Sequence, residues 1–123
     1  MKGYNSKAMQ FFTWDEMEKE VISEVFARRF VYGEKTMVAQ VYLKKGAVVP
    51  LHRHENEQIT YILEGALELE LEGQRVVVGK GQVLVIPSGV PHSAVALEDT
   101  LDLDIFSPPR QDWIEKSDAY LRK

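Results

Sequence analysis

Residues 46–65 read GAVVPLHRHENEQITYILEG and place two histidines, His52 and His54, one residue apart. Residues i and i+2 of an extended chain point to the same face, so the two imidazoles can converge on one metal ion. A neutral imidazole nitrogen suits zinc, nickel, copper and iron. The pair is therefore a candidate for two metal ligands. An H-x-H pattern alone more often reflects two surface histidines near a turn, here with Arg53 and Glu55 as solvated neighbours.

Gln58 begins the strand that follows the two histidines, and its amide oxygen is a neutral, hard donor atom. Glu57 is a competing ligand, but neighbours along a strand point to opposite faces, so only one of the two can reach the histidines. The alternative for Gln58 is a polar residue at a strand end. His92, the last of the three histidines, follows a Gly/Pro loop and also opens a strand. A purely structural role does not explain why all three histidines start strands.

The rest of the chain reads as short strands separated by glycine-rich turns. Residues 66–72 (ALELELE) alternate apolar and acidic side chains with a period of two, which is typical of a strand with one buried face. Strands are expected at 36–43, 58–63, 66–72, 75–78, 82–86, 92–97 and 101–106. No helix separates them, so the pattern predicts an all-β antiparallel sandwich or barrel and disfavours a parallel α/β fold.

Short helices are expected at the two ends. Thr13 and Glu16 form a possible capping box that predicts a short N-terminal helix or turn through about Lys19. Residues 110–122 carry an apolar stripe and predict a C-terminal amphipathic helix. We expect a single domain over residues 1–123, with the barrel core at about 36–107.

The composition is that of an ordinary globular protein, with 123 residues, 45% hydrophobic and 28% charged. The net charge of −4 argues against a nucleic-acid or anionic-membrane partner. The absence of cysteine excludes disulfides, thiolate nucleophiles and cysteine-rich zinc sites. No apolar run is long enough for a signal-peptide core or a membrane span. We expect a soluble, cytoplasmic protein.

At these residues the sequence resembles the cupin family. One cupin motif is matched from Gly46 to Gly65 and the second from Gly81 to His92, each with the family's spacing. The resemblance implies a single-domain, RmlC-like jelly-roll barrel that holds one divalent metal, which could be zinc, nickel, iron or manganese. The implied metal ligands are His52, His54, Gln58 and His92. Most cupins carry glutamate where this chain has glutamine, and the amide leaves the site one charge more positive. Such a site should favour an anionic oxygen ligand and suit iron–oxygen redox cycling less well.

A second resemblance is to the pectin-degradation cupins, small proteins that share the glutamine ligand and a D-x-F-x-x-x-R run. Here the run is Asp104, Phe106 and Arg110. In residues 101–106 (LDLDIF), Asp102, Asp104 and Phe106 share one strand face. An aromatic on a polar face fits a ligand cavity. The alternative is an exposed edge with two solvated aspartates.

The second resemblance implies a metal-dependent isomerase or tautomerase that converts 4,5-unsaturated uronates into linear 4-deoxy-5-keto uronates. The metal would act as Lewis acid, Asp104 as acid/base, Arg110 as carboxylate clamp and Phe106 as cavity wall. The alternatives are another metal-dependent cupin enzyme, such as an iron dioxygenase, and a non-catalytic sugar- or metal-binding cupin.

Two further expectations concern partners. The substrate would be a small anionic sugar, for which Arg28 and Arg29 are weaker contact candidates than Arg110. Cupins often pair, so we expect a homodimer, in which the apolar patch at residues 9–12 fits a contact. The alternative is that this patch packs on its own barrel.

Overall fold

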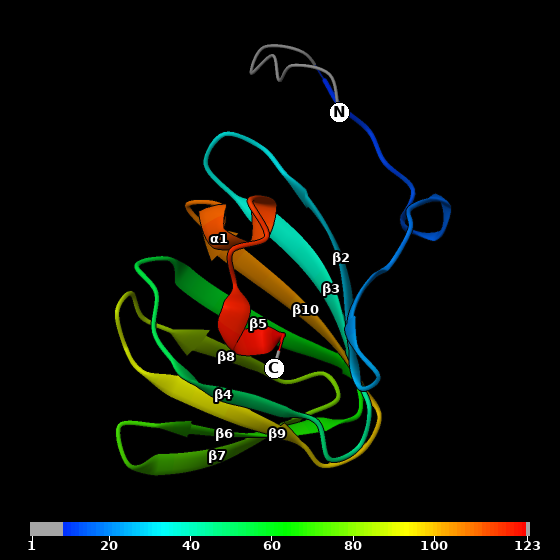
Figure 1. The fold of residues 1–123 in the computed structure, drawn as a ribbon. Coiled ribbons are helices and arrows are strands. Elements are labelled where there is room, and N and C mark those ends of the chain that lie inside the picture. Colours follow the sequence, from blue (N-terminus) through cyan, green and yellow to red (C-terminus); the bar gives the residue numbers. More distant parts are fainter. Residues whose placement is uncertain (1–8, 123) are drawn as a thin grey trace.

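The computed structural model describes residues 9–122, which fold into two facing antiparallel sheets (Figure 1). The larger sheet has the strand order β1-β2-β3-β10-β5-β8. Its strands are β1 (Glu20–Ser23), β2 (Phe26–Tyr32), β3 (Met37–Leu43), β10 (Thr100–Ser107), β5 (Glu57–Glu64) and β8 (Val83–Ile86). The smaller sheet has the order β4-β9-β6-β7. Its strands are β4 (Val48–His52), β9 (His92–Ala96), β6 (Ala66–Leu71) and β7 (Gln74–Gly79).

The core fills the space between the sheets, where alternate residues of each strand meet. In β3 the burial alternates perfectly, with Met37, Ala39, Val41 and Leu43 buried. In β6, Leu67 and Leu69 are buried from the opposite sheet. The period-two patterns in the sequence therefore arise because each of the two sheets buries one face.

Strand β10 lies at the centre of the larger sheet, paired with β3 on one side and β5 on the other. Its inner face carries Asp102, Asp104 and Phe106, all of them buried. The register places Asp104 opposite Thr60 and Phe106 opposite Gln58. The alternative of an exposed edge with two solvated aspartates is therefore wrong, because a central strand turns this face into the interior.

The all-β antiparallel prediction is confirmed, and the seven expected strands correspond to β3 and β5–β10 within a residue or two. Three strands were not predicted: β1, β2 and β4. Strand β2 contains two adjacent arginines and β4 contains Pro50, and both features weaken a strand signal. Strands β1 and β2 extend the larger sheet to Glu20, ahead of the expected barrel core. The single-domain organisation over 1–123 stays a prediction.

The two terminal elements are shorter than expected. At the N-terminal side, a single 3₁₀ turn (η1, Trp14–Glu16) forms, and the Thr13 side chain makes no capping hydrogen bond, so the capping-box prediction is wrong. The C-terminal helix exists as α1 (Gln111–Ile114), followed by a 3₁₀ turn η2 (Ala119–Leu121). One continuous helix over 110–122 is wrong, because Lys116 adopts a left-handed conformation (φ 58°) that ends the helix.

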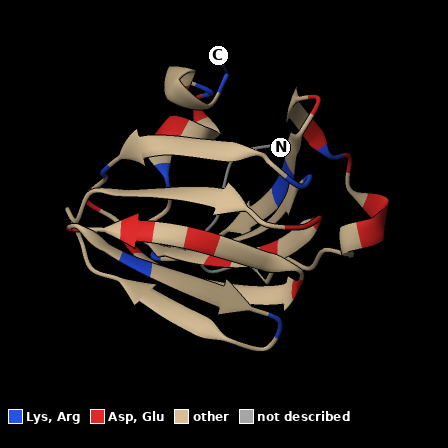
Figure 2. Ribbon diagram, turned by 90° about the horizontal axis from the view of Figure 1, so that it is seen from below, with Lys and Arg blue, Asp and Glu red and all other residues tan. Residues whose placement is uncertain are grey.

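Charged residues of both signs are scattered over strands and loops in Figure 2, in line with the small net charge of −4. Within residues 9–122, the structure contains no helix of the length and apolarity needed to cross a membrane.

Candidate metal centre

The three histidines meet between the two sheets, although they come from separate segments. His52 ends β4 and His92 begins β9, and the two are a cross-strand pair. His54 lies in the loop between β4 and β5, so the expectation that all three histidines start strands is wrong: only His92 does. One ligand nitrogen from each ring lies within 4.8 Å of the others. The structure therefore brings together the three histidines that the sequence analysis selected.

Each histidine ring is oriented by a backbone carbonyl group two residues away. The Nδ1–O distances are 2.7 Å for His52 with Pro50, 3.0 Å for His54 with Asn56, and 2.8 Å for His92 with Val90. A carbonyl can only accept, so Nδ1 carries the proton and Nε2 keeps a free lone pair. The Nε2 atom of His92 is buried without any hydrogen-bond partner among the described residues. This arrangement is the one by which proteins orient metal-binding histidines.

Gln58 lies next to the histidines as the second residue of β5. Its side chain is buried, whereas that of Glu57 is exposed. Its amide nitrogen donates to Thr60 Oγ1 at 2.9 Å and lies 3.4 Å from Asp104 Oδ1. The amide oxygen therefore turns toward the histidines, 3.2 Å from Nε2 of His54. Two atoms that can only accept then face each other, which is unfavourable unless a cation lies between them.

The donor set therefore fits one divalent metal ion: three imidazole nitrogens and one amide oxygen, all neutral. The neighbouring side chains also explain why residue 58 is a glutamine and not a glutamate. Thr60 donates its hydroxyl hydrogen to Asp104 Oδ1 at 2.8 Å, so it can accept only from a donor such as the Gln58 amide. A glutamate at 58 would offer no such hydrogen and would place a carboxylate against that of Asp104.

The environment keeps the histidines uncharged at neutral pH. Burial lowers the pKa of His52 and His54 to about 4, and positive charge on Arg110 and the other histidines acts in the same direction. Burial also lowers the pKa of His92. Neutral imidazoles are ready to bind a metal without first losing a proton.

Two carboxyl groups, Asp102 and Asp104, extend from β10 into the same interior. Burial raises the pKa of Asp104, and it raises that of Asp102 well above its usual value, with the neighbouring Asp104 charge adding to the effect. Asp104 lies within hydrogen-bond distance of Gln58, whereas Oδ1 of Asp102 has no hydrogen-bond partner among the described residues. A carboxyl with a raised pKa can accept and return a proton near neutral pH.

Phe106 and Arg110 lie on the same side of the cluster. Phe106 is 1% exposed and stands edge-on to the His54 ring, with 5.9 Å between centroids. Arg110 is 2% exposed and lies over the Phe106 ring at 5.1 Å. Its guanidinium group donates to both carboxylate oxygens of Asp112, at 2.9 and 2.8 Å. The arginine is thus buried next to the histidines and already holds one carboxylate of its own chain.

Two side chains at the site were not singled out from the sequence. Thr60 joins Gln58 to Asp104, and Tyr120 stacks on His52 with 4.7 Å between ring centroids and 27° between planes. Thr60 lies two positions after Gln58 in the same strand, and residues i and i+2 of a strand share a face. This periodicity could have identified Thr60 from the sequence. Tyr120 is far from the other site residues in the sequence, and no local pattern marks it.

Arg28 and Arg29 do not reach the histidines. Arg28 is fully buried and binds Glu20 and Asp118. Arg29 bonds to the backbone carbonyls of Trp14 and Met17, so it holds the N-terminal segment against β2. Both contact groups of their own chain.

The histidines lie between two hollows. An internal cavity of about 50 Å³ is lined by residues that include His52, Gln58, His92 and Tyr120. A wider cleft of about 730 Å³ is lined by residues that include His54, Asn56 and Asp112.

Comparison with known proteins agrees with the motifs. A family model described as "Cupin domain" matches residues 39–107. The pectin degradation protein KdgF of Dickeya dadantii is 28% identical over 85% of this chain and 98% of its own length. The solved structure of KdgF from Halomonas sp. is 36% identical, with a TM-score of 0.81 over 86% of this chain and 99% of that one. An RmlC-like cupin from Shewanella frigidimarina is 26% identical, also with a TM-score of 0.81, over 89% of this chain and 99% of that one.

Proposed function

The chain belongs to the cupin family, and on that premise we propose that it is a metal-dependent enzyme of pectin or polyuronate degradation. Its reaction would convert 4,5-unsaturated uronate monosaccharides into linear 4-deoxy-5-keto uronates. One observation carries the proposal: three of the four expected metal ligands, His52, Gln58 and His92, line one cavity together with Asp104, Phe106 and Arg110. The likeness to two KdgF proteins over most of the chain supports the substrate class.

The reaction needs one proton to move and no atom to be gained or lost. The hydroxyl hydrogen on C1 leaves as the bond between C1 and the ring oxygen breaks. The electron pair passes to the ring oxygen, which leaves an enolate at C5. Carbon C4 then takes a proton and C5 becomes a ketone. One acid/base group placed beside the ring is enough for both transfers.

Asp104 is the group that we assign to this proton. It is buried, its pKa is raised by that burial, and its Oδ1 is held by Thr60 at 2.8 Å, so its position is fixed. Asp102 beside it hinders the loss of both protons from the pair, because two adjacent buried carboxylates repel each other. The pair can therefore keep one proton available for C4.

Arg110 is the group that we assign to the substrate carboxylate. Its Nη1 makes no hydrogen bond to any residue of the described chain, while Nε and Nη2 are held by Asp112. The Asp112 pair fixes the plane of the guanidinium and leaves one edge for an anion. Phe106 forms an apolar wall that excludes water from the ring.

His52, His54, Gln58 and His92 would hold the metal. When bound, a divalent metal supplies Lewis acidity toward an anionic oxygen, and a site without carboxylate ligands preserves its full positive charge for that purpose. The metal could be zinc, nickel, iron or manganese.

The test is an Asp104→Asn variant assayed on 4,5-unsaturated galacturonate, by loss of the ultraviolet absorbance of the conjugated double bond. We expect kcat to fall by about 100-fold or more, the usual contribution of an acid/base group. An Asp15→Asn variant, changed at an exposed carboxylate, is the matched control. Unchanged turnover in Asp104→Asn would remove Asp104 from the chemistry.

We propose in addition that the protein is cytoplasmic and acts as a homodimer. Met9 and Phe11 are 100% and 92% exposed, so these residues of the apolar patch do not pack on their own barrel. That exposure supports a contact with a second copy. Sedimentation of the wild type and of a Phe11→Ser variant would test it: a dimer that the variant weakens supports the contact, and a monomeric wild type contradicts it.

A further inference from the structure

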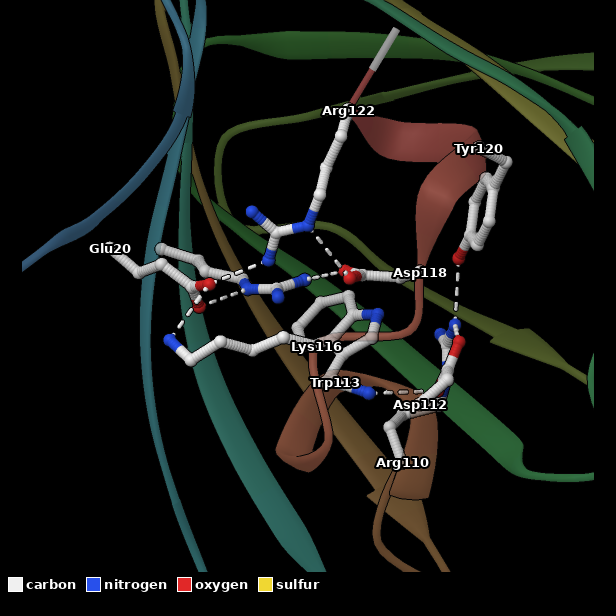
Figure 3. A network of polar contacts seen from close by, with 9 residues as sticks. Glu20, Arg110, Asp112, Trp113, Lys116, Asp118, Tyr120 and Arg122 are labelled. Atoms are coloured by element: carbon white, nitrogen blue, oxygen red, sulfur yellow. Dashed lines mark hydrogen bonds and ion pairs between the residues drawn. The ribbon is translucent and has the colours of Figure 1, made fainter.

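The last residues of the described chain fold back over the metal site. After α1 the chain turns at Lys116 and runs through η2, which contacts β4. This C-terminal segment, residues 117–122, carries Tyr120 onto the outer side of His52. Figure 3 shows the segment and the polar contacts that surround it.

The C-terminal segment is held by ion pairs rather than by strand pairing. Asp118, 1% exposed, receives a hydrogen bond from Arg28 Nη1 at 2.6 Å. Arg122 binds Asp118 at 3.1 Å and Glu20 at 2.7 Å (Figure 3). These contacts fasten the segment to β1 and β2 of the larger sheet. Moving it would break these ion pairs and expose the buried Leu121, but it would break no ladder hydrogen bond.

The segment leaves two hydrogen-bond donors unused next to the metal site. Tyr120 Oη accepts from Arg110 Nη2 at 2.7 Å, which leaves the phenol hydrogen free to be donated. Within residues 9–122, the phenol hydrogen of Tyr120 and the hydrogens on Arg110 Nη1 make no hydrogen bond to another group. Two adjacent donors are complementary to the oxygens of an anion.

The space beneath Tyr120 is too small for a sugar. The internal cavity measures about 50 Å³, and its walls include His52, Asp104, Arg110 and Tyr120. Pockets that hold small molecules usually measure roughly 300–1,000 Å³. A ligand that contacts both the histidines and Asp104 therefore requires a wall to move, and the C-terminal segment is the wall that can move without breaking a sheet.

We propose that residues 117–122 form a lid over the metal site, and that Tyr120 on this lid donates its phenol hydrogen to an oxygen of the anionic sugar that Arg110 holds. The identity of the sugar rests on the function proposed above, whereas the lid does not. The ion pairs of Arg122 and Asp118 keep the lid closed, and their weakening opens it.

The lid is tested first without any sugar. Nickel-loaded protein is mixed with excess EDTA, and the rate of metal extraction is measured for the wild type, Arg122→Ala and Lys80→Ala. The Arg122 change removes two ion pairs of the lid, and the Lys80 change removes a surface pair with Glu64 far from it. We expect Arg122→Ala to lose metal about tenfold faster, and Lys80→Ala to match the wild type. Equal rates for Arg122→Ala and the wild type would overturn the lid.

The donor role of Tyr120 is tested by calorimetric binding of D-galacturonate to nickel-loaded Tyr120→Phe. Phenylalanine keeps the ring on His52 and removes only the hydroxyl. We expect the dissociation constant to rise about tenfold, the effect of one hydrogen bond to a charged group, with the extraction rate unchanged. Wild-type affinity in Tyr120→Phe, or no binding of galacturonate by the wild type, would overturn the donor role.

The two outcomes separate the lid from the proposed reaction. Absence of turnover on unsaturated galacturonate, together with fast extraction from Arg122→Ala, would sink the reaction and support the lid. Normal turnover with equal extraction rates would do the reverse.

Discussion

Two polar clusters of this sandwich, an ion network and the candidate metal site, use their hydrogen-bonding atoms in opposite ways. In the ion network, made of Glu20, Arg28, Lys116, Asp118 and Arg122, every member faces a group of opposite charge at 2.6–3.2 Å. In the metal site, made of His52, His54, Gln58 and His92, neutral acceptor atoms face one another. Trp113 lies between them: Arg28 of the ion network and Arg110, which lies beside the histidines, both lie over its ring.

The difference separates a structural cluster from a functional one. Charges that pair within the chain are complete when the chain has folded, and they fix where the C-terminal segment lies. The His92 Nε2 atom and the Gln58 oxygen gain nothing from folding alone, since burial without a partner costs free energy. Such atoms are explained by a ligand that supplies the missing positive charge.

The largest effect should come from breaking the ion network at its buried centre. Asp118→Asn removes the fully buried negative charge that faces Nη1 of the fully buried Arg28, which then has only Glu20 as a counter-charge. We expect the free energy of unfolding in urea to fall by about 3–5 kcal/mol, as for other buried pairs that lose one member. Asp15→Asn, at the exposed partner of Arg29, is the control and should change it by less than about 1 kcal/mol. Equal, small losses in both variants would contradict a structural role for the network.

The matching change in the metal site is His92→Ala, and its effect should fall on metal binding. Loss of one direct ligand should weaken nickel affinity by at least about 100-fold, the upper end of what outer-shell changes cause. Competition with a chelating dye measures it, with Lys80→Ala as control. Nickel affinity in His92→Ala within a few-fold of the wild type would exclude His92 as a ligand.

The local features of the candidate metal site could be predicted from the sequence. Spacing predicted that His52 and His54 could face one metal ion, whereas the full ligand set with Gln58 and His92 came from the resemblance to cupins. The alternation in 101–106 likewise placed Asp104 and Phe106 on one face, and the structure shows that face turned inward. Period-two geometry carries such local information.

The ion network could not be predicted in the same way. Arg28 and Asp118 are 90 positions apart, and their pairing depends on how the C-terminal segment crosses β2. The two adjacent arginines suggested surface residues, and Arg28 is instead fully buried. Tyr120 was not predicted as a site residue for the same reason, because only the fold brings it onto His52. Contacts that depend on a chain reversal leave no periodic signal.

Thr60→Val is a smaller test, aimed at the support of one ligand. Valine keeps the volume but loses the hydroxyl that joins Gln58 to Asp104. The Gln58 amide is then free to rotate, and nickel affinity should fall by about tenfold, as expected when an outer-shell partner is removed. Thr36→Val, at an exposed position, is the control. Unchanged affinity in Thr60→Val would show that Gln58 needs no such support.

The smallest predicted effect is a pH dependence of stability in the ion network. Burial opposes ionisation of Glu20, but hydrogen bonds from Arg28 and Arg122 outweigh it and lower the pKa to about 2 from 4.5. The unfolded chain therefore binds the proton first. The contribution of Glu20 is fully present above pH 4.5 and is lost as the pH falls toward 2. Urea unfolding should show a shallower acid dependence in Glu20→Gln than in the wild type, and identical slopes would contradict the assignment.

The central claim is that the metal site and Asp104 together linearise unsaturated uronates. We would measure the ultraviolet absorbance of 4,5-unsaturated galacturonate after adding metal-free protein, and then after adding back one equivalent of nickel, zinc, iron or manganese in turn. We predict loss of absorbance well above the spontaneous rate only with metal present, and its arrest by EDTA. The spontaneous rate with every metal bound would contradict the account.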